Sequence, residues 1–215
     1  MFEVHRREFM KNIITIQHTQ SVHHTKGMIG GQGDWALTDL GLEQAKQIGK
    51  NLSKEIDGSK YIMYTSDLMR ARQTAENTGK YLGITPKLTS ALREISCGEA
   101  NGISKEESKK IFTGSMKTID DKSYPGAESM RDVWNRLSVF LDEILNDKEE
   151  NIIIVAHGIS LGIFNLLWLG LDAEALNKCG MWGTSGSVSF MRQESPKFGD
   201  KRIISRFNDC SYSRI

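Results

Sequence analysis

Ile152-Ile153-Ile154-Val155-Ala156-His157-Gly158 is an apolar run that ends in a histidine and a glycine, and Ile13-Ile14-Thr15-Ile16-Gln17-His18 has the same form. Such runs predict strands that are buried on both faces of a parallel sheet. Polar residues at the carboxyl ends of parallel strands face the crevice where α/β proteins bind ligands. Either histidine alone could be a hydrogen-bonded packing residue. Together they predict one shared pocket that contains His18 and His157.

The rest of the chain alternates between short apolar strands and amphipathic helices, which predicts an α/β fold with a mixed, mostly parallel sheet. Helices are expected on both faces, giving a three-layer sandwich. The segment 99–124 is more polar and has no clear period, so we expect it to form a small inserted cap over a cleft. A length of 215 residues suits one domain, and residues 1–215 are predicted to form it.

The expected elements can be placed along the chain. Strands are predicted at Asn12–Ile16, Tyr61–Tyr64, Pro86–Thr89 and the run ending at Ala156, with two antiparallel closing strands at Ser187–Met191 and Arg202–Phe207. Helices are predicted after a Thr38 cap, with Leu40, Ile48, Leu52 and Ile56 on one stripe; from a Ser66 or Asp67 cap to Gly83; after Pro125-Gly126; and over Ser160–Leu171.

Composition narrows the class of partner. Lysine and arginine total 28 against 27 acidic residues, a net charge of +1, so neither nucleic acid nor an anionic membrane is expected as a partner. The most apolar segment, Leu161–Leu171, is too short to span a bilayer, and Met1–Lys11 does not resemble a secretory signal. Three widely spaced cysteines argue against a disulfide framework or a zinc ribbon, and they favour a cytoplasmic location.

Four polar groups follow the predicted strands and would meet at one edge of the sheet. They are residues 17–21, residues 66–70, Arg93-Glu94 and His157-Gly158. A neutral imidazole can attack phosphorus, while cations and N–H donors hold the equatorial oxygens. A carboxylic acid can protonate the departing oxygen, and its carboxylate can then activate water. This set of residues suits the transfer of a phosphoryl group.

Ordered motifs between about Ile13 and Phe164 resemble the histidine phosphatase, or phosphoglycerate mutase-like, superfamily. Gln17-His18-Thr19-Gln20-Ser21 stands where that family has Arg-His-Gly-Glu-Thr. The other matching stretches are Gly33-Asp34 with Leu37–Gly41, Ser66–Ala75, Leu92–Ile95 with Gly98, Pro125–Ser129, and Val155–Gly158.

The resemblance implies that family's fold and a metal-independent phosphatase that hydrolyses a phosphate monoester through a phosphohistidine on His18. Arg70 and His157 would bind the phosphoryl group, and Glu94 would donate the proton. The candidate substrate-binding residues are Gln17, Ser21, His24 and Gly158. No cofactor or metal is implied, and the partner would be a small phosphorylated substrate whose identity, like the oligomeric state, the sequence does not specify.

Several residues depart from the family pattern. Gln17 replaces an arginine, and because a charged hydrogen bond contributes about 1.5–3 kcal/mol against about 1 for a neutral one, phosphate binding is expected to weaken roughly tenfold. Thr19 replaces a glycine and is expected to crowd the substrate or shift the tautomer of His18. Gln20 replaces a carboxylate, a loss of negative charge that would partly offset the change at Gln17. Tyr212 stands where the family usually has a histidine.

Alternatives to this interpretation remain open. The same fold could be a phosphoglycerate mutase-type phosphotransferase, or a phosphate-binding protein whose turnover was weakened or lost with Gln17, Thr19 and Gln20. His23 and His24 suggest a metal site, but neighbouring side chains of an extended loop point apart, so solvated residues or anion donors are favoured. Nearby residues have structural interpretations: Arg93 as a loop tether, Arg72 in a surface salt bridge, Cys97 as a small buried residue, Lys105, Lys109 and Lys110 on a solvated face, and the four tryptophans in the core.

Overall fold

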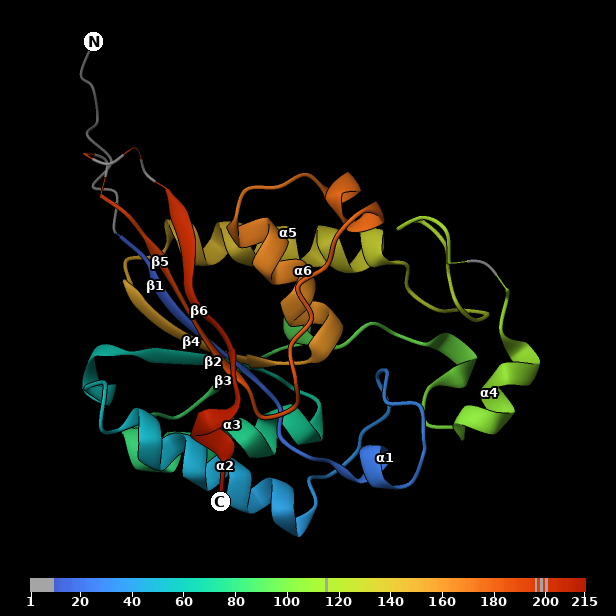
Figure 1. Ribbon diagram of the computed structural model, residues 1–215, viewed down its shortest axis with the longest axis horizontal. Helices are drawn as coiled ribbons and strands as arrows, with labels where there is room; N and C mark the ends of the chain where they lie inside the picture. The colour runs from blue at the N-terminus through green and yellow to red at the C-terminus, as the bar shows by residue number, and fades with distance from the viewer. Residues whose placement is uncertain (1–9, 115, 196, 198, 200) are drawn as a thin grey trace.

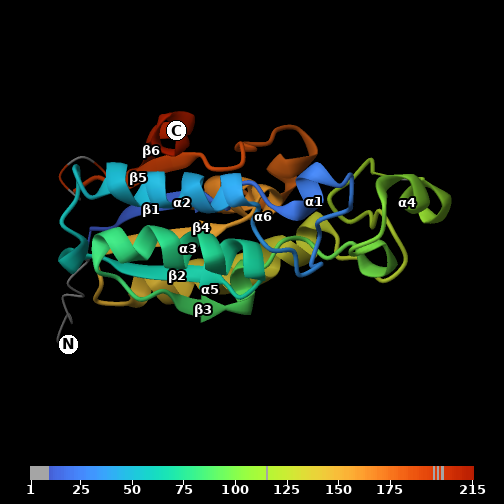
Figure 2. The ribbon, with the colours of Figure 1, turned by 90° about the horizontal axis from the view of Figure 1, so that it is seen from below.

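The computed structural model describes residues 10–114, 116–195, 197, 199 and 201–215. Within these residues, one six-stranded sheet carries helices on both faces (Figures 1 and 2). The strand order is β3-β2-β4-β1-β5-β6, in which β3, β2, β4 and β1 are parallel, while β5 runs antiparallel to β1 and β6 antiparallel to β5. The predicted α/β fold with a mixed, mostly parallel sheet is confirmed.

The elements lie close to the predicted ranges. The strands are β1 (Asn12–Gln17), β2 (Ile62–Ser66), β3 (Lys87–Thr89), β4 (Asn151–Ala156), β5 (Val188–Gln193) and β6 (Arg202–Asp209). The helices are α1 (Val22–Thr25), α2 (Asp39–Leu52), α3 (Met69–Leu82), α4 (Lys105–Ile111), α5 (Met130–Asn146) and α6 (Gly158–Trp168). Short 3-10 helices occur at Gly58–Lys60, Ser90–Leu92, Gly98–Ala100, Ala173–Asn177 and Cys210–Ser213.

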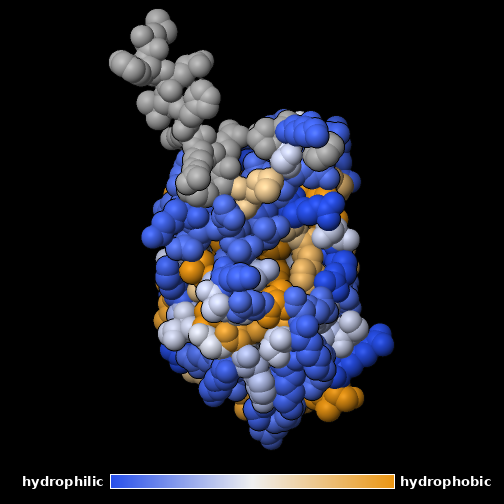
Figure 3. Space-filling view, turned by 90° about the vertical axis from the view of Figure 1, so that its left-hand side faces the viewer, coloured by the Kyte–Doolittle hydropathy of each residue, from blue (hydrophilic) through white to orange (hydrophobic). Residues whose placement is uncertain are grey.

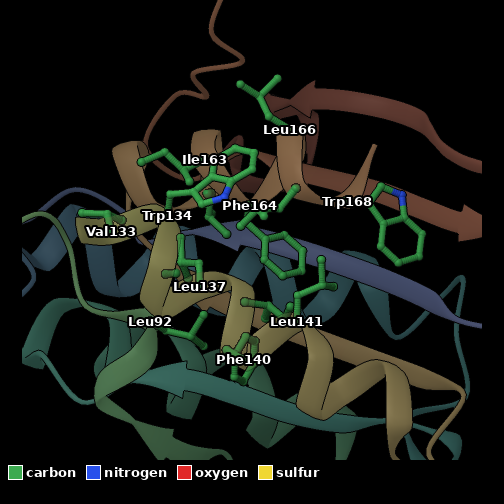
Figure 4. Close-up of a cluster of buried hydrophobic side chains, with 14 of the residues drawn as sticks. Leu92, Val133, Trp134, Leu137, Phe140, Leu141, Ile163, Phe164, Leu166 and Trp168 are labelled. Atoms are coloured by element: carbon green, nitrogen blue, oxygen red, sulfur yellow. The ribbon is translucent and has the colours of Figure 1, made fainter. Parts of the chain in front are cut away.

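Two hydrophobic cores lie on opposite faces of the sheet. Successive residues of a strand point to opposite faces, so Ile152 and Ile154 pack with α5 and α6, whereas Ile153 and Val155 pack with α2 and α3. Figure 4 shows the first core, where Phe164 of α6 lies between the sheet and the side chains of α5. Burial on both faces explains why the strand sequences are continuously apolar.

Helix α2 begins as predicted but has a shorter buried stripe. The Thr38 hydroxyl accepts a hydrogen bond from the N–H of Gly41 at 3.0 Å, which confirms the predicted cap. Ile48 and Leu52 are fully buried, whereas Leu40 is 46% exposed. Ile56 lies beyond the last helical residue and reaches the same core from the following loop. The expected stripe is therefore correct only for its central members.

Helix α3 ends as predicted at Gly83, whose φ of 69° is a left-handed conformation that suits glycine. Its predicted cap is wrong: Leu68 is the capping residue, and it has no side-chain hydrogen bond. The first N–H of the helix, that of Met69, instead donates to Asp34 at 2.7 Å. The carboxylate of Asp34, from a distant loop, thus accepts the hydrogen bond of the first helical N–H. The local sequence around α3 could not indicate this contact.

The segment predicted as a cap, 99–124, contains α4 and lies beyond α1 at the right-hand end of Figure 1. Backbone hydrogen bonds join it to the loop that follows α1, including Ile29 N–H to the Ile103 carbonyl at 2.8 Å. Figure 3 shows the opposite end of the molecule, where hydrophilic residues surround a central depression with hydrophobic residues.

The tryptophans do not all lie in the core. Trp134 and Trp168 are buried as expected, but Trp182 is 43% exposed, so the prediction of a core position is wrong for this residue. Trp182 lies in the loop between α6 and β5, and its surroundings bear on the functional site.

The role of Asp34 gives the first test. Asp34→Ala is expected to reduce the free energy of unfolding by about 1 kcal/mol, because the first N–H of α3 loses its partner. Asp34→Asn keeps an acceptor oxygen and should cost less. Urea denaturation measures both, with Asp39→Ala as the exposed-residue control; equal losses for the Ala and Asn variants would contradict the capping role.

Candidate active site

A cavity of about 320 Å³ opens at the carboxyl ends of the parallel strands, and Trp182 contributes to its wall. The register pairs Gln17 with Ala156, so the residues that follow them leave the sheet side by side. The ring centres of His18 and His157 lie 5.2 Å apart. Six of the eight predicted site residues line the cavity: Gln17, His18, His24, Arg70, Glu94 and Gly158.

His18 has the tautomer of a nucleophile. Its Nδ1 lies 2.8 Å from the carbonyl oxygen of Thr19, which can only accept, so Nδ1 carries the proton. Its Nε2 lies 3.2 Å from Nε of Arg70, which can only donate, so Nε2 presents its lone pair. Burial, and then the nearby Arg70, hold the pKa of His18 well below its usual value. The imidazole is therefore neutral at neutral pH and able to attack.

Arg70, in the first turn of α3, is a buried cation at the floor of the cavity. Its Nη1 donates to the carbonyl of Gly33 at 2.8 Å and its Nη2 to that of Gly31 at 2.7 Å. Burial lowers its pKa to about 10, so it stays charged at neutral pH. Together with the bond to His18, three of its five N–H groups have partners among the described residues, which leaves two for an anion.

His157 is fully buried at the start of α6, and neither of its ring nitrogens has a hydrogen-bond partner among the described residues. Leaving a buried polar group unpaired costs about 1–3 kcal/mol, so such a group points to a ligand. Burial, followed by the charge of Arg70, keeps the pKa of His157 well below its usual value. Its neutral ring lies beside that of His18 but is not among the groups that line the cavity.

The carboxylate of Glu94 is fixed at the cavity by the beginning of α6. Oε1 accepts hydrogen bonds from the N–H of Ser160 at 3.1 Å and from that of Ile95 at 3.0 Å. Oε2 accepts from the N–H of Ile159 at 3.2 Å. The Ser160 hydroxyl donates to the Arg93 carbonyl at 2.7 Å, and its oxygen lies 3.2 Å from Oε1 of the carboxylate. The side chain, which lines the cavity, is thus held in one defined orientation.

Gln17 lies between the cavity and a small hollow behind it, and it lines both. Its Oε1 is buried without a hydrogen-bond partner in the described residues, and its Nε2 would lie 3.4 Å from a Cβ added to Gly158. A side-chain amide therefore stands at the wall where the related family has an arginine.

The side chains of Thr19 and Gln20 form hydrogen bonds outside the cavity. The Thr19 hydroxyl donates to the Gly41 carbonyl at 2.7 Å, so the side chain points toward α2, and its backbone carbonyl leaves the nucleophilic tautomer of His18 intact. The Gln20 amide oxygen accepts from the Thr38 hydroxyl at 2.8 Å, outside the cavity. The expected crowding by Thr19 is wrong, whereas the expected charge offset at Gln20 stays a prediction.

His23 and His24 form a second imidazole pair beside the nucleophile. The ring of His24 stacks on that of His18 with centres 5.4 Å apart, and the rings of His23 and His24 lie 4.0 Å apart. Ser21 is fully buried and does not line the cavity; its hydroxyl meets Nδ1 of His23 at 2.7 Å. Burial, followed by the charge of His24, lowers the pKa of His23 to about 3.

Neighbouring residues have structural roles. Arg93 makes two hydrogen bonds to the Asp67 carboxylate, at 2.7 and 2.6 Å, which confirms its role as a tether. Arg72 pairs with Glu76 at the helix surface, as expected. Cys97 is only partly buried and lines the cavity; burial raises the pKa of its thiol to about 11. The described residues contain no group of three or more His, Cys, Asp or Glu side chains placed to hold a metal ion.

Sequence reasoning missed part of the cavity wall. Ile29, Ile159 and Trp182 lie outside the quoted motifs, and Ile95, which ends the Leu92–Ile95 motif, was not assigned to the site. Tyr212, which replaces a family histidine, hydrogen-bonds Arg206 at 2.7 Å and lies outside the cavity. Across the described part of the chain, each helix is too short or too polar to cross a membrane.

Residues 13–203 match the model of the histidine phosphatase superfamily (branch 1). This chain belongs to that superfamily. A similar relative, "Putative phosphoserine phosphatase 2" of Hydrogenobacter thermophilus, is 32% identical over 78% of this chain and 83% of its own length. The 2,3-bisphosphoglycerate-dependent phosphoglycerate mutase of Nitrobacter winogradskyi is 33% identical over 76% of this chain and 84% of its own.

Solved structures of histidine phosphatase fold also match. Bacillus stearothermophilus YhfR has a TM-score of 0.79 and 21% identity, covering 95% of this chain and 100% of its own. A mycobacterial glucosyl-3-phosphoglycerate phosphatase has a TM-score of 0.78 and 20% identity, covering 93% of this chain and 99% of its own. The predicted superfamily and fold are confirmed, and the chain is an enzyme of the histidine phosphatase type.

The buried histidines of this histidine phosphatase predict how its stability depends on pH. An unfolded histidine takes up a proton below about pH 6.5, whereas His18 and His157 resist protonation when folded because burial lowers their pKa values. Below pH 6.5 the unfolded chain therefore binds more protons than the folded protein. The contribution of each histidine to the free energy of unfolding is fully present above pH 6.5 and falls by about 1.4 kcal/mol per pH unit below it. Urea unfolding of the wild type and His157→Asn at pH 7.5 and 5.5 measures this. The variant should show the smaller loss; equal losses would contradict burial of a neutral His157.

Proposed function

We propose that this protein is a metal-independent phosphomonoesterase that works through a phosphohistidine on His18. The observation that carries the proposal is the hydrogen bonding of His18, whose Nδ1 is fixed as the donor and whose unprotonated Nε2 accepts a hydrogen bond from Arg70. A cation and an unpaired imidazole beside it, Arg70 and His157, supply what a phosphoryl group needs. The substrate is a small phosphorylated molecule, and three free cysteines support a cytoplasmic location.

In the first step, Nε2 of His18 attacks phosphorus and the ester P–O bond breaks. Glu94 gives a proton to the departing oxygen, so the alcohol leaves neutral. In the free protein the Nε–H of Arg70 donates to Nε2 of His18 and so covers the nucleophilic lone pair. When the substrate binds, this hydrogen bond must break, and the Nε–H must donate to a phosphoryl oxygen instead. His157 and the amide of Gln17 donate to the remaining oxygens, with His24 and Gly158 at the same wall.

In the second step, water attacks the phosphohistidine and gives a proton to the Glu94 carboxylate as the P–N bond breaks. Glu94 thereby returns to the protonation state in which it started the cycle. Neutral His18 is then restored, with the Nδ1–H still donating to the Thr19 carbonyl. A mutase would need the phosphoryl group to pass to a second hydroxyl instead of water, and the names of the relatives include both activities.

The two steps predict different effects at His18 and Glu94. His18→Ala is expected to lower kcat/KM for every phosphate ester by more than about a thousandfold, because no P–N bond can form. Glu94→Gln should lower kcat/KM by roughly a hundredfold or more for glycerol 2-phosphate, and by less for p-nitrophenyl phosphate, whose leaving group departs without a proton. Release of inorganic phosphate measures both, with the Glu99→Gln variant as control. Equal background rates from wild type and His18→Ala would remove the proposal.

Gln17 favours a second candidate function, a phosphate-binding protein with little turnover, because the cavity lacks the charge of an arginine there. Gln17→Arg is expected to tighten inhibition by inorganic phosphate roughly tenfold, since a charged donor replaces a neutral one. A large rise of kcat from near zero in this variant would favour the weakened protein over an active phosphatase. An unchanged inhibition constant would contradict the position given to Gln17 at the phosphate.

A further inference from the structure

The most deeply buried polar side chains of the cavity are His18 and Arg70, whereas Gln17, His23, His24 and Glu94 are more exposed. His18 and Arg70 are 3% and 1% exposed, so the groups proposed to hold phosphate lie at the floor. The side chains of Ile29, Ile159 and Trp182 are more exposed and, with Ile95, form the part that we call the apolar rim. A phosphoryl group at the floor would therefore direct the alcohol part of an ester to the apolar rim.

The indole of Trp182 packs against two glycines, whose missing side chains leave room for it. A Cβ added to Gly162 of α6 would lie 2.1 Å from Cε3 of the indole, and one added to Gly180 would lie 2.4 Å from its Nε1. The loop before it is anchored where the buried Asn165 of α6 donates to the carbonyl of Met181 at 3.0 Å. A large aromatic ring is thus kept in a fixed position beside the cavity while 43% of its surface stays exposed. Because Trp182 also lines the cavity, this exposed part of the ring is available to a ligand bound there.

The cavity has few positively charged groups that could bind a second anionic group of the substrate. Arg70 is the only lysine or arginine among the residues that line it, and three of its N–H groups already have partners. His23 and His24 are neutral at neutral pH because burial lowers their pKa values. Lys105 of α4 acts on both rings through its charge but does not line the cavity. A carboxylate or second phosphate on the substrate would find no lysine or arginine other than Arg70 among the residues that line the cavity.

We propose that this enzyme acts on phosphate monoesters whose alcohol part is uncharged and apolar or aromatic, and that Trp182 selects them by packing against that part. The proposal rests on the phosphomonoesterase function above and adds to it the class of substrate. It differs from the substrates named for the relatives, phosphoserine and phosphoglycerate, which carry a carboxylate.

The test compares kcat/KM for 1-naphthyl phosphate with that for glycerol 2-phosphate, O-phosphoserine and 3-phosphoglycerate. The wild type should prefer 1-naphthyl phosphate. Trp182→Ala should lower the ratio of naphthyl to glycerol ester roughly tenfold, because a stacking contact is lost. Gly162→Ala should lower it too, since the added methyl displaces the indole without removing it. Leu171→Ala, an exposed residue outside the cavity, is the matched control, and thermal denaturation checks that each variant folds.

Preference for an anionic ester, or an unchanged ratio in both Trp182→Ala and Gly162→Ala, would overturn the proposal. If 3-phosphoglycerate were preferred and Lys105→Ala abolished that preference, the cation on α4 would be the selecting residue instead. If the wild type hydrolysed no ester faster than His18→Ala, the phosphomonoesterase function itself would fall. Calorimetry would then measure the binding of 1-naphthyl phosphate and glycerol 2-phosphate, which tests the apolar rim without turnover. Loss of 1-naphthyl phosphate binding in Trp182→Ala would support the role of the rim, and equal binding of the two esters would contradict it.

Discussion

The parallel pairing of β1 with β4 is the constraint on which the active site depends. Gln17 lies opposite Ala156, and the N–H of His18 donates to the Ala156 carbonyl at 2.9 Å, so the pairing continues into the first residue of the site. A shift by one residue would turn each strand's side chains to the other face and bury the wrong set in each core. Since both faces are packed, the two cores fix the register that brings His18 next to His157.

Desolvation then gives the site its chemistry. Four imidazoles and one guanidinium share a region in which His18 and His157 are fully shielded from water, so the rings stay neutral and only Arg70 carries positive charge. Neutral rings suit a nucleophile and N–H donors, whereas protonated rings would remove the attacking lone pair. The exchange of arginine for Gln17 therefore leaves the nucleophile intact and reduces the charge that attracts the phosphate.

Sequence was sufficient for the parts of the molecule that follow periodicity and order. The apolar runs predicted β1 and β4, and their ends predicted that His18 and His157 lie side by side, although only His18 lines the cavity. The Ser66–Ala75 motif led to Arg70, which also lines it. It failed where a side chain acts across distant segments. Asp34 caps α3 from 35 positions away, and Gln20 turns to Thr38 although it lies two residues from the nucleophile. Trp182 has no periodic or motif signal. Its position depends on Gly162 and Gly180, where a side chain would collide with the indole, and only the folded structure shows that these two glycines lie against it.

The floor proposed to bind phosphate and the apolar rim come mostly from different parts of the chain, although Ile159 of the rim also lies in the first turn of α6. The floor is carried by strand ends and by the first turns of α3 and α6, which the sheet register and the cores hold in place. The rim comes mainly from loops, where Ile29 follows α1 and Trp182 precedes β5. Loop side chains can change without disturbing a packed core, so one floor can serve many esters. Membership of the superfamily therefore determines the chemistry at phosphorus, while the choice of alcohol depends on residues such as Trp182 that the family motifs do not include.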